Sequence, residues 1–347
     1  MSPRRPTPEP ETRRASHAPA DFARPEGVPD DAILTSFAVR PEQSGHRLDR
    51  WLSLELPRLT RSRAQRIVEE WAFDVTGRQL RPSHRVRVGE VIVVFRPRWD
   101  EPDAPRDITV VYADAHMVAV DKPAGLPVHP TARYHKNTLT AVLAERFPGE
   151  RVVLAHRLDR ETSGVLLAAR TPAAERTLKM AFAERRIHKT YLAVVHGEVA
   201  DDTFTVDAPM CLEGGEVNVK MCVRPEAKGG LASVTRVEVV ERLRGFTVVA
   251  AHPETGRQHQ IRVHLAHAGH PLVGDKLYAH GDEVFLRCLD APPDAETEAM
   301  LLLPRHALHA HAIRFAHPAT GDETDITAPL PTDLRAFCDG RRREGAT

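Results

Sequence analysis

Apolar side chains recur with a helical period in the N-terminal third of the chain. In the segment 48–56 they fall at i, i+3, i+4 and i+8, which places them on one face of a helix that Pro57 ends. A second helix is expected to begin at Thr60 and to run through TRSRAQRIVEEWAF with the same one-sided pattern. Short strands are expected in FDVTG and VRVGEVIVVF, so this region is predicted to be a small helical and β unit. The apolar positions of the two helices are Leu48, Trp51, Leu52, Leu56, Ala64, Ile67, Val68 and Trp71.

Farther along the chain, apolar runs of strand length alternate irregularly with amphipathic segments. ITVVYAD and HMVAVDKPAG are expected to form paired strands, and TLTAVLAERF a short helix. TPAAERTLKMAFAERR predicts a longer helix with Thr171 as N-cap and Pro172 in its first turn. HKTYLAVVHGEV, ASVTRVEVVERL and GFTVVAAHP predict strands, HQIRVHLAHAG a helix, and DAPPDAETEAM (290–300) a surface loop. Because no regular strand–helix–strand rhythm occurs, we expect an α+β fold with a mainly antiparallel, mixed β-sheet and flanking helices.

Composition divides the chain into five segments. The 347 residues are too many for one small domain, and 41% hydrophobic with 28% charged residues is the balance of a globular protein. The expected segments are a disordered Pro/Arg-rich tail at 1–36, a small domain at 37–97, a linker at 98–107, a larger domain at 108–335 and a C-terminal tail at 336–347.

The net charge is zero, but the charge is unevenly distributed. Between Arg40 and Trp99 there are thirteen arginines, no lysine and seven acidic residues, a surplus of six positive charges. A locally basic domain suits phosphate binding, with a solvated charged surface as the alternative. A helix N-terminus surrounded by arginines is also suited to holding phosphate. The arginines expected to contact nucleic acid around the second helix are Arg58, Arg61, Arg63 and Arg66.

The cysteines and the apolar runs indicate a cellular compartment. The four cysteines are widely spaced and form no CxxC pair, which is typical of reduced thiols in the cytoplasm. The N-terminus lacks the apolar core of a secretory signal, and no apolar run approaches the roughly 20 residues that span a bilayer. A cytoplasmic protein with no membrane partner is therefore expected.

The pentapeptide HRLDR occurs twice, at 46–50 and at 156–160, and places an aspartate between two arginines each time. The first copy begins an amphipathic helix, so Asp49 is expected to face water and to complement the helix dipole. The second copy lies between the apolar runs VVLA and VLLAA, which are expected to be central strands. Asp159 is then expected on a partly buried loop between rigid walls, a common place for functional groups. A catalytic carboxylate and a structural Asp–Arg pair both fit this pattern.

The second copy also carries a family resemblance. VLAHRLDRETSGVLLAAR resembles the signature of the RluA-type pseudouridine synthases, in which HRLD is followed by TSG and an apolar strand. VAVDKPAGLPVHP, IHKTYLAVVHGEV, ETGRQHQIRVHLAHAGHPLVGDKLY and ALHAHAIRFAHP resemble further blocks of this family, in the family's order. The five blocks cover nearly all of 108–335. The region 37–95 is similar to the small RNA-binding domain named after the fourth ribosomal small-subunit protein, although FDVTGRQL departs from its usual strand.

This resemblance implies isomerisation of uridine to pseudouridine in RNA, most simply in large-subunit ribosomal RNA, because an N-terminal RNA-binding domain accompanies relatives with that substrate. It implies Asp159 as the catalytic residue, acting as nucleophile or as base, and requires neither metal nor other cofactor. It further implies that Arg157 fills the space of an extruded base and that Tyr191 stacks on the uracil. Arg262 is expected to be the basic partner of Asp159, with Arg257 as the second candidate.

Several alternatives remain open from the sequence. Three other classes of protein would share part of the pattern. They are a transfer-RNA pseudouridine synthase, a non-catalytic RNA-binding ribosome-assembly protein of the same fold, and a glycoside hydrolase that uses Glu161 as its second carboxylate. No obligate protein partner is indicated. A histidine cluster lacks the HExxH spacing and nearby acids of a metal site, so hydrogen-bonding and structural roles are expected for it. Its members are His259, His264, His267 and His270.

Overall fold

The computed structural model divides into two compact units, residues 1–100 and 101–347, and each is described by itself. Among the described residues, no helix has both the length and the apolarity that crossing a bilayer needs. The described residues are 22–30, 32–56, 61–96, 101–131 and 133–342.

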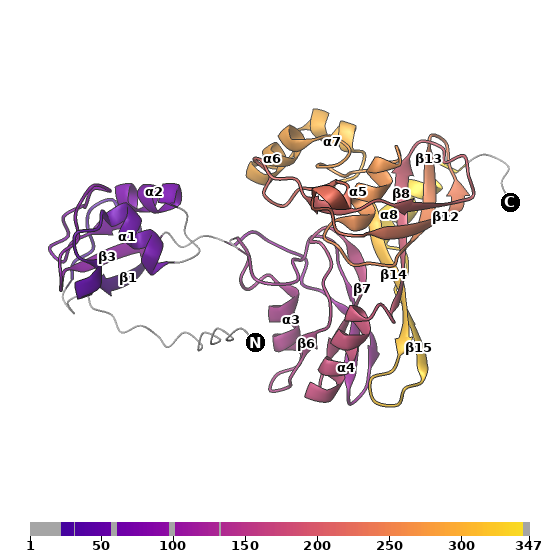
Figure 1. Ribbon diagram of the computed structural model, residues 1–347, viewed down its shortest axis with the longest axis horizontal. Helices are drawn as coiled ribbons and strands as arrows, with labels where there is room; N and C mark the ends of the chain where they lie inside the picture. The colour runs from indigo at the N-terminus through magenta and orange to yellow at the C-terminus, as the bar shows by residue number, and fades with distance from the viewer. Residues whose placement is uncertain (1–21, 31, 57–60, 97–100, 132, 343–347) are drawn as a thin grey trace. The chain divides into compact units, whose positions relative to one another are not determined.

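The N-terminal unit contains two helices and a three-stranded sheet of order β1-β3-β2 (Figure 1). The helical pattern is confirmed, since Leu48, Trp51 and Leu52 are fully buried and pack with Ala64 and other apolar residues of the second helix. Burial of these side chains is the main stabilisation of such a small unit. The elements are β1 Ile33–Ala38, the 3-10 helix η1 Pro41–Gln43, α1 Leu48–Glu55, α2 Arg61–Trp71, β2 Ala72–Phe73 and β3 Val91–Arg96.

Two expectations for this unit are corrected. The strand β1 lies before residue 37 and pairs along its length with β3, so the tail expected at 1–36 extends too far. Val28 and Ala32 are also buried, against Phe95 of β3. The strand expected in FDVTG is limited to two residues, because Asp74 accepts hydrogen bonds from the backbone of the turn that follows. Residues 1–21 and the expected helix start at Thr60 lie outside the described residues.

The C-terminal unit is built on a ten-stranded mixed sheet, which confirms the expected α+β class. The main path runs β4-β5-β7-β14-β8-β13-β12-β9, with β15 paired to β14 and β6 to β7. β7 and β14 run parallel, and the other pairings printed in this sheet are antiparallel. A separate two-stranded hairpin, β10-β11, lies beside α5. The strands are β4 Thr109–Ala113, β5 Met117–Lys122, β6 Val153–Leu154, β7 Ser163–Ala169, β8 His188–His196, β9 Thr203–Asp207, β10 Met210–Leu212, β11 Met221–Val223, β12 Val234–Arg242, β13 Phe246–Pro253, β14 Leu308–Ala316 and β15 Glu323–Thr327.

Helices cover this sheet and enclose separate apolar clusters (Figure 1). α4 begins as expected, with the Thr171 hydroxyl accepting a hydrogen bond from Ala174 N and with Pro172 in the first turn. All seven residues of β7 are buried, because clusters containing residues of α3 and of α4 both include β7 side chains. The helices are α3 Leu139–Arg146, α4 Pro172–Ala183, η2 Glu226–Lys228, α5 Gln260–His267, α6 Asp282–Asp290, α7 Ala295–Leu301 and α8 Thr332–Asp339.

Two expectations for the larger unit are also corrected. The run VVLA was expected to be a central strand, but β6 has two residues and lies off the main path of the sheet. The segment 290–300 was expected to be a loop, but most of it forms α7, whose N-cap Asp294 accepts a hydrogen bond from Thr297 N. The two prolines in DAPPDAETEAM precede this helix and do not interrupt it.

Candidate active site around Asp159

The second HRLDR copy forms a loop between β6 and β7, and buried polar contacts fix it at both ends. Within the loop, Thr162 N donates to the carbonyl of Asp159 at 3.2 Å. The hydroxyl of Thr162 meets His306 Nε2 at 2.8 Å, and that of Ser163 meets His309 Nδ1 at 2.9 Å. These contacts tie the loop to β14 and to the segment before it. The carboxylate of Asp159 is therefore presented from a rigid support.

Lys122 holds the same loop from β5, although it was not among the predicted site residues. Its side chain is fully buried, and its Nζ donates to the carbonyls of Pro123, Leu126 and Arg160 at 2.8, 3.0 and 3.0 Å. Burial lowers the pKa of Lys122 to about 7, while the nearby charge of Asp159 opposes this shift. The contact between Lys122 and Arg160 spans 38 positions of sequence, so no local pattern predicts it. Only the position of Lys122 in the block VAVDKPAG could have indicated that this lysine belongs to the site.

Arg262, on α5, is the basic partner of Asp159. Its Nη1 lies 3.3 Å from Asp159 Oδ2. Its Nε and Nη2 donate to the two oxygens of Asp275 at 2.7 and 2.9 Å, a bidentate pair. Burial would lower the pKa of Arg262, but the charge and hydrogen bonds of Asp275 and the charge of Asp159 raise it above its usual value. Arg262 is thus always charged and places a fixed positive charge beside Asp159.

Asp275 was missed by the sequence reasoning, and it fixes the position of Arg262. Its side chain is 0% exposed. Its Oδ1 also accepts hydrogen bonds from Leu277 N and Tyr278 N, both at 3.0 Å. Burial opposes ionisation of this carboxyl, but the charge and hydrogen bonds of Arg262 outweigh it and hold the pKa well below its usual range.

His259 and Tyr278 form a second pair beside the carboxylate. His259 Nε2 lies 3.8 Å from Asp159 Oδ2, and its Nδ1 lies 2.8 Å from the Tyr278 hydroxyl. Burial, together with the charges of Arg262 and Arg157, lowers the pKa of His259 to about 4 against the opposing charges of Asp159 and Asp275. The imidazole is therefore neutral at pH 7.

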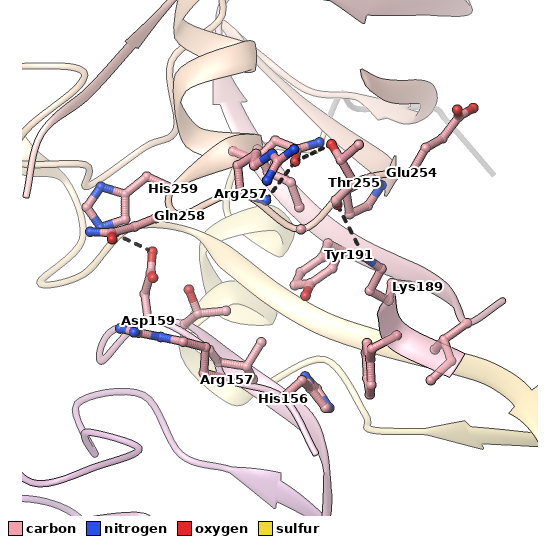
Figure 2. Close-up of a pocket in the computed structure, with 18 of the residues that line it drawn as sticks. His156, Arg157, Asp159, Lys189, Tyr191, Glu254, Thr255, Arg257, Gln258 and His259 are labelled. Atoms are coloured by element: carbon pink, nitrogen blue, oxygen red, sulfur yellow. Dashed lines mark hydrogen bonds and ion pairs between the residues drawn. The ribbon is translucent and has the colours of Figure 1, made fainter. Parts of the chain in front are cut away.

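Asp159, His259 and Arg262 line a pocket of about 540 Å³ that is large enough for a nucleoside. Figure 2 shows Asp159 and His259 facing one another on one side of the pocket, with Lys189 and Glu254 on the opposite side and Tyr191 between them. Tyr191, on β8, is partly buried and packs against two apolar clusters. Burial and the charge of Asp159 raise the pKa of its hydroxyl, so the ring is neutral.

The rim of the pocket carries cations. Arg157 is exposed and lines the pocket, as does Arg185, which has a positive φ of 58°. Arg257 also lines it, and its buried Nε has no hydrogen-bond partner among the described residues. The structure therefore places Arg262, not Arg257, against Asp159, and leaves Arg257 toward the pocket. Lys189 donates to Thr255 O at 3.2 Å at the far end.

The first HRLDR copy corrects a prediction. Asp49 was expected to face water, but its side chain is 1% exposed. Arg47 donates to both of its oxygens, at 3.2 and 3.0 Å, and Arg50 N donates to Oδ1 at 2.7 Å. The segment 82–84 lies over the start of α1, where its carbonyls accept from Leu48 N and Asp49 N. This long-range contact, which the helical pattern does not encode, buries the carboxylate.

The arginines predicted to contact nucleic acid are placed only in part. Arg66 is exposed on α2, and Arg61 and Arg63 belong to the first turn of the same helix. Arg58 lies outside the described residues.

The side chains invoked by the alternative hypotheses are engaged elsewhere. Glu161 accepts from Lys276 Nζ at 2.9 Å and lies 3.6 Å from His306. His264 is buried, with Nδ1 2.9 Å from the Thr235 hydroxyl and Nε2 3.0 Å from the carbonyl of Ala208. Among the described residues, no group of three or more His, Cys, Asp or Glu side chains is arranged to hold a metal ion. A hydrogen-bonding role accounts for His264.

Comparison with known proteins identifies the class to which this fold and pocket belong. Residues 116–267, which include Asp159, Tyr191 and Arg262, match the family described as RNA pseudouridylate synthase. Solved structures of two human proteins, RNA Pseudouridylate Synthase Domain Containing 1 and 4, are 27% and 26% identical, with TM-scores of 0.54 and 0.52. They cover 68% and 65% of this chain, and 89% and 90% of their own chains are matched.

Three relatives match over nearly the whole chain. Ribosomal large subunit pseudouridine synthase D of Xanthomonas campestris is 36% identical over 92% of this chain and 96% of its own length. The protein of the same name from Pseudomonas aeruginosa is 34% identical over 88% and 94%. Ribosomal large subunit pseudouridine synthase C of Escherichia coli is 34% identical over 86% and 93%. The chain belongs to the RNA pseudouridylate synthase family, as the sequence motifs predicted.

Proposed function

We propose that this protein isomerises uridine to pseudouridine in large-subunit ribosomal RNA, with Asp159 as the catalytic residue. The observation that carries the proposal is the position of Asp159 in a nucleoside-sized pocket, 3.3 Å from the buried guanidinium of Arg262. A carboxylate that is 23% exposed and lies beside a fixed cation remains accessible to a substrate.

The proposed reaction breaks the N1–C1′ bond of uridine, rotates the uracil and joins C5 to C1′. The proton on C5 is released and N1 gains one, so the reaction is an isomerisation that needs no oxidant or reductant. Asp159 acts either by attacking C1′ or by removing a proton, and both routes require an ionised carboxylate beside the ribose. The enclosed pocket retains the detached uracil and keeps water from C1′.

A uracil in folded RNA must leave its base stack before it can reach this pocket, which costs a few kcal/mol. In the proposed complex Tyr191 stacks on the uracil, an interaction worth about 1–3 kcal/mol. Arg157 is exposed at the pocket and fills the space that the base leaves. Both roles are supported by placement, since the two side chains line the same pocket as Asp159.

The ribosomal substrate is supported by the named relatives, whose match includes the N-terminal unit. Under this proposal residues 37–97 bind RNA, with Arg58, Arg61, Arg63 and Arg66 contributing phosphate contacts, and residues 108–335 form the catalytic domain. A cytoplasmic location follows from the proposed substrate. Transfer RNA is the alternative that the experiments below must separate from ribosomal RNA.

Tritium release from RNA transcribed with 5-tritiated uridine tests the reaction, because the C5 proton is lost. The native protein should release tritium from large-subunit ribosomal RNA, and Asp159→Ala should release none while still binding the RNA. Asp49→Ala is the matched control from the identical pentapeptide, and it should retain turnover once its folding has been checked by circular dichroism. An active Asp159→Ala protein would refute the proposal.

The RNA substrate is tested by mapping pseudouridines in cells that lack the gene. Loss of a modification from large-subunit ribosomal RNA, with transfer RNA unchanged, is the expected result. Loss confined to transfer RNA would overturn the ribosomal part of the proposal. Removing residues 1–100 should weaken binding to ribosomal RNA and flatten its salt dependence.

A further inference from the structure

Two hydrogen bonds and one longer polar contact link the β10-β11 hairpin to the carboxylate of Asp159. The backbone N–H of Met221 donates to the Tyr278 hydroxyl at 3.0 Å. That hydroxyl lies 2.8 Å from His259 Nδ1, and His259 Nε2 lies 3.8 Å from Asp159 Oδ2. Arg262 also lies over the Tyr278 ring, with its guanidinium carbon 4.9 Å from the ring centroid. Figure 2 shows His259 and Asp159 on the same side of the pocket.

These contacts determine which ring nitrogen of His259 carries the hydrogen. The Tyr278 oxygen already accepts from Met221, so its own proton is best used toward Nδ1, which then accepts. A neutral imidazole that accepts at Nδ1 carries its hydrogen on Nε2. The opposite tautomer would aim a lone pair of Nε2 at the carboxylate of Asp159 and leave the tyrosine proton without this partner. Both considerations place N–H on the side of the pocket.

His259 has an unfavourable backbone conformation, which the surrounding structure must maintain for the ring to keep its position. His259 has φ 55° and ψ 16°, the left-handed region that a non-glycine residue seldom adopts. Such conformations cost about 1–3 kcal/mol and concentrate at functional sites. The neighbouring Gln258 donates from Nε2 to Val219 O of the same hairpin, at 3.3 Å. The hairpin thus supports the His259 turn at two points.

We propose that His259 is a positioning residue for the reaction, a neutral donor whose Nε2–H holds Oδ2 of Asp159. The imidazole ring is held in turn by Tyr278 and the β10-β11 hairpin. The inference rests on the proposed function of Asp159. The 3.8 Å separation is longer than a hydrogen bond, so the contact forms when the carboxylate moves toward the ribose. It then orients the carboxylate together with Arg262, which contacts the same oxygen, Oδ2.

The protonation state that this role requires fits the surroundings of His259. The charged groups around it are Asp159, Arg157, Arg262 and Asp275, and burial outweighs the two carboxylates to give a pKa of about 4. Protonation would add a hydrogen at Nδ1 and oppose the Tyr278 hydroxyl. At pH 7 the neutral imidazole can therefore accept from the Tyr278 hydroxyl at Nδ1 and donate from Nε2 at the same time.

Imidazole ¹⁵N spectra of the full-length protein test the tautomer without reference to activity. The resonances of His259 are identified by their absence from His259→Gln. At pH 7 we expect the neutral form with hydrogen on Nε2, and a mixture of tautomers in Tyr278→Phe. A charged imidazole, or hydrogen on Nδ1, would overturn the proposal.

Single-turnover tritium release from transcribed ribosomal RNA tests the role in the reaction. His259→Leu should slow the chemical step by about 10- to 100-fold, the value of one hydrogen bond to a charged group, with RNA affinity unchanged. His259→Gln should recover much of the rate, because its amide N–H can occupy the place of Nε2–H. His267→Gln, an exposed position on the same helix, is the control.

The outcomes separate this inference from the proposed function. A native protein that releases no tritium refutes the proposed function and, with it, the role of His259. A native protein that turns over, together with a His259→Leu protein of nearly native rate, refutes only the positioning role. Should His259→Leu fail to fold, the comparison of Tyr278→Phe with the native protein decides, since loss of the Tyr278 hydroxyl should lower the rate at unchanged RNA affinity.

Discussion

Asp275 fixes Arg262 against Asp159, and replacing it by asparagine should both destabilise the larger unit and slow the reaction. The carboxylate accepts four hydrogen bonds, two from Arg262 and one each from Leu277 N and Tyr278 N. All four partners are donors, so either orientation of an asparagine amide directs an N–H group at another donor. The buried guanidinium would also lose its principal counter-charge.

The expected loss of unfolding free energy in Asp275→Asn depends on the burial of the ion pair and on the partner that Arg262 retains. Breaking a buried ion pair by removing one member costs about 3–5 kcal/mol. Arg262 keeps its contact with Asp159 at 3.3 Å, so we expect the lower end, about 3 kcal/mol. Arg305 and Asp333 form a bidentate pair with nearly the same distances, 2.7 and 3.0 Å, but Asp333 is 39% exposed. Asp333→Asn should therefore cost about 1 kcal/mol or less and serves as the control.

Urea unfolding measures this cost, and the chain has an internal reference. Its three tryptophans, Trp51, Trp71 and Trp99, all lie within residues 1–100. Tryptophan fluorescence consequently follows the N-terminal unit, whereas far-ultraviolet circular dichroism is dominated by the larger one. Asp275→Asn should shift the dichroism transition and leave the fluorescence transition in place.

A double-mutant cycle decides whether the ion pair is the cause. Arg262→Gln combined with Asp275→Asn should cost at least about 2 kcal/mol less than the sum of the single variants, because the double variant leaves no unpaired buried charge. Strictly additive costs, or a cost below about 1 kcal/mol for Asp275→Asn alone, would refute the reasoning.

Three further outcomes are expected. Gly164→Ala should lower the unfolding free energy by at least about 2 kcal/mol, because φ is +113° and the new Cβ would lie 2.2 Å from a carbonyl oxygen of β14; an unchanged melting temperature would contradict this. Burial lowers the pKa values of His156 and His306 to about 3, so unfolding takes up protons below pH 6.5. In urea titrations the unfolding free energy should therefore fall by about 1.4 kcal/mol per pH unit for each histidine as the pH drops toward 4. A flat profile would refute the burial of these histidines in the neutral form. Arg257→Gln should reduce the slope of log Kd against log salt for RNA by about 0.7–0.9, and an unchanged slope would exclude a phosphate contact.

The helices that were predicted are those whose stabilisation is local. The i, i+3, i+4 spacing of Leu48, Trp51 and Leu52 and the cap at Thr171 are properties of neighbouring residues, and both are confirmed. α7 was missed because the prolines of DAPPDAETEAM suggested a loop, although Asp294 and Thr297 carried an N-cap signal at the right spacing. The short length of β6 was not predictable, because pairing with β7, and not its own apolar pattern, sets its extent.

The parts of the site that escaped prediction depend on contacts between distant segments. Lys122 reaches Arg160 across 38 positions. The motif resemblance supplied Asp159, Tyr191 and Arg262, which the structure brings to one pocket. No local pattern marks Asp275 as the fourth member, because its role is defined only when α5 and the turn that follows it meet.

The two HRLDR copies show how the same five residues acquire different properties. In the first copy the arginine before the leucine donates to the aspartate of its own pentapeptide, so the charges of Arg47 and Asp49 are satisfied locally and the pair is a structural element of α1. In the second copy Arg262 takes the place of that arginine at Asp159. Arg157 is thereby left free to face the pocket, where a cation can enter a base stack. A guanidinium supplied from α5 thus leaves two separate groups at the pocket in place of a self-contained ion pair, and the proposed reaction uses the carboxylate for the ribose and Arg157 for the RNA.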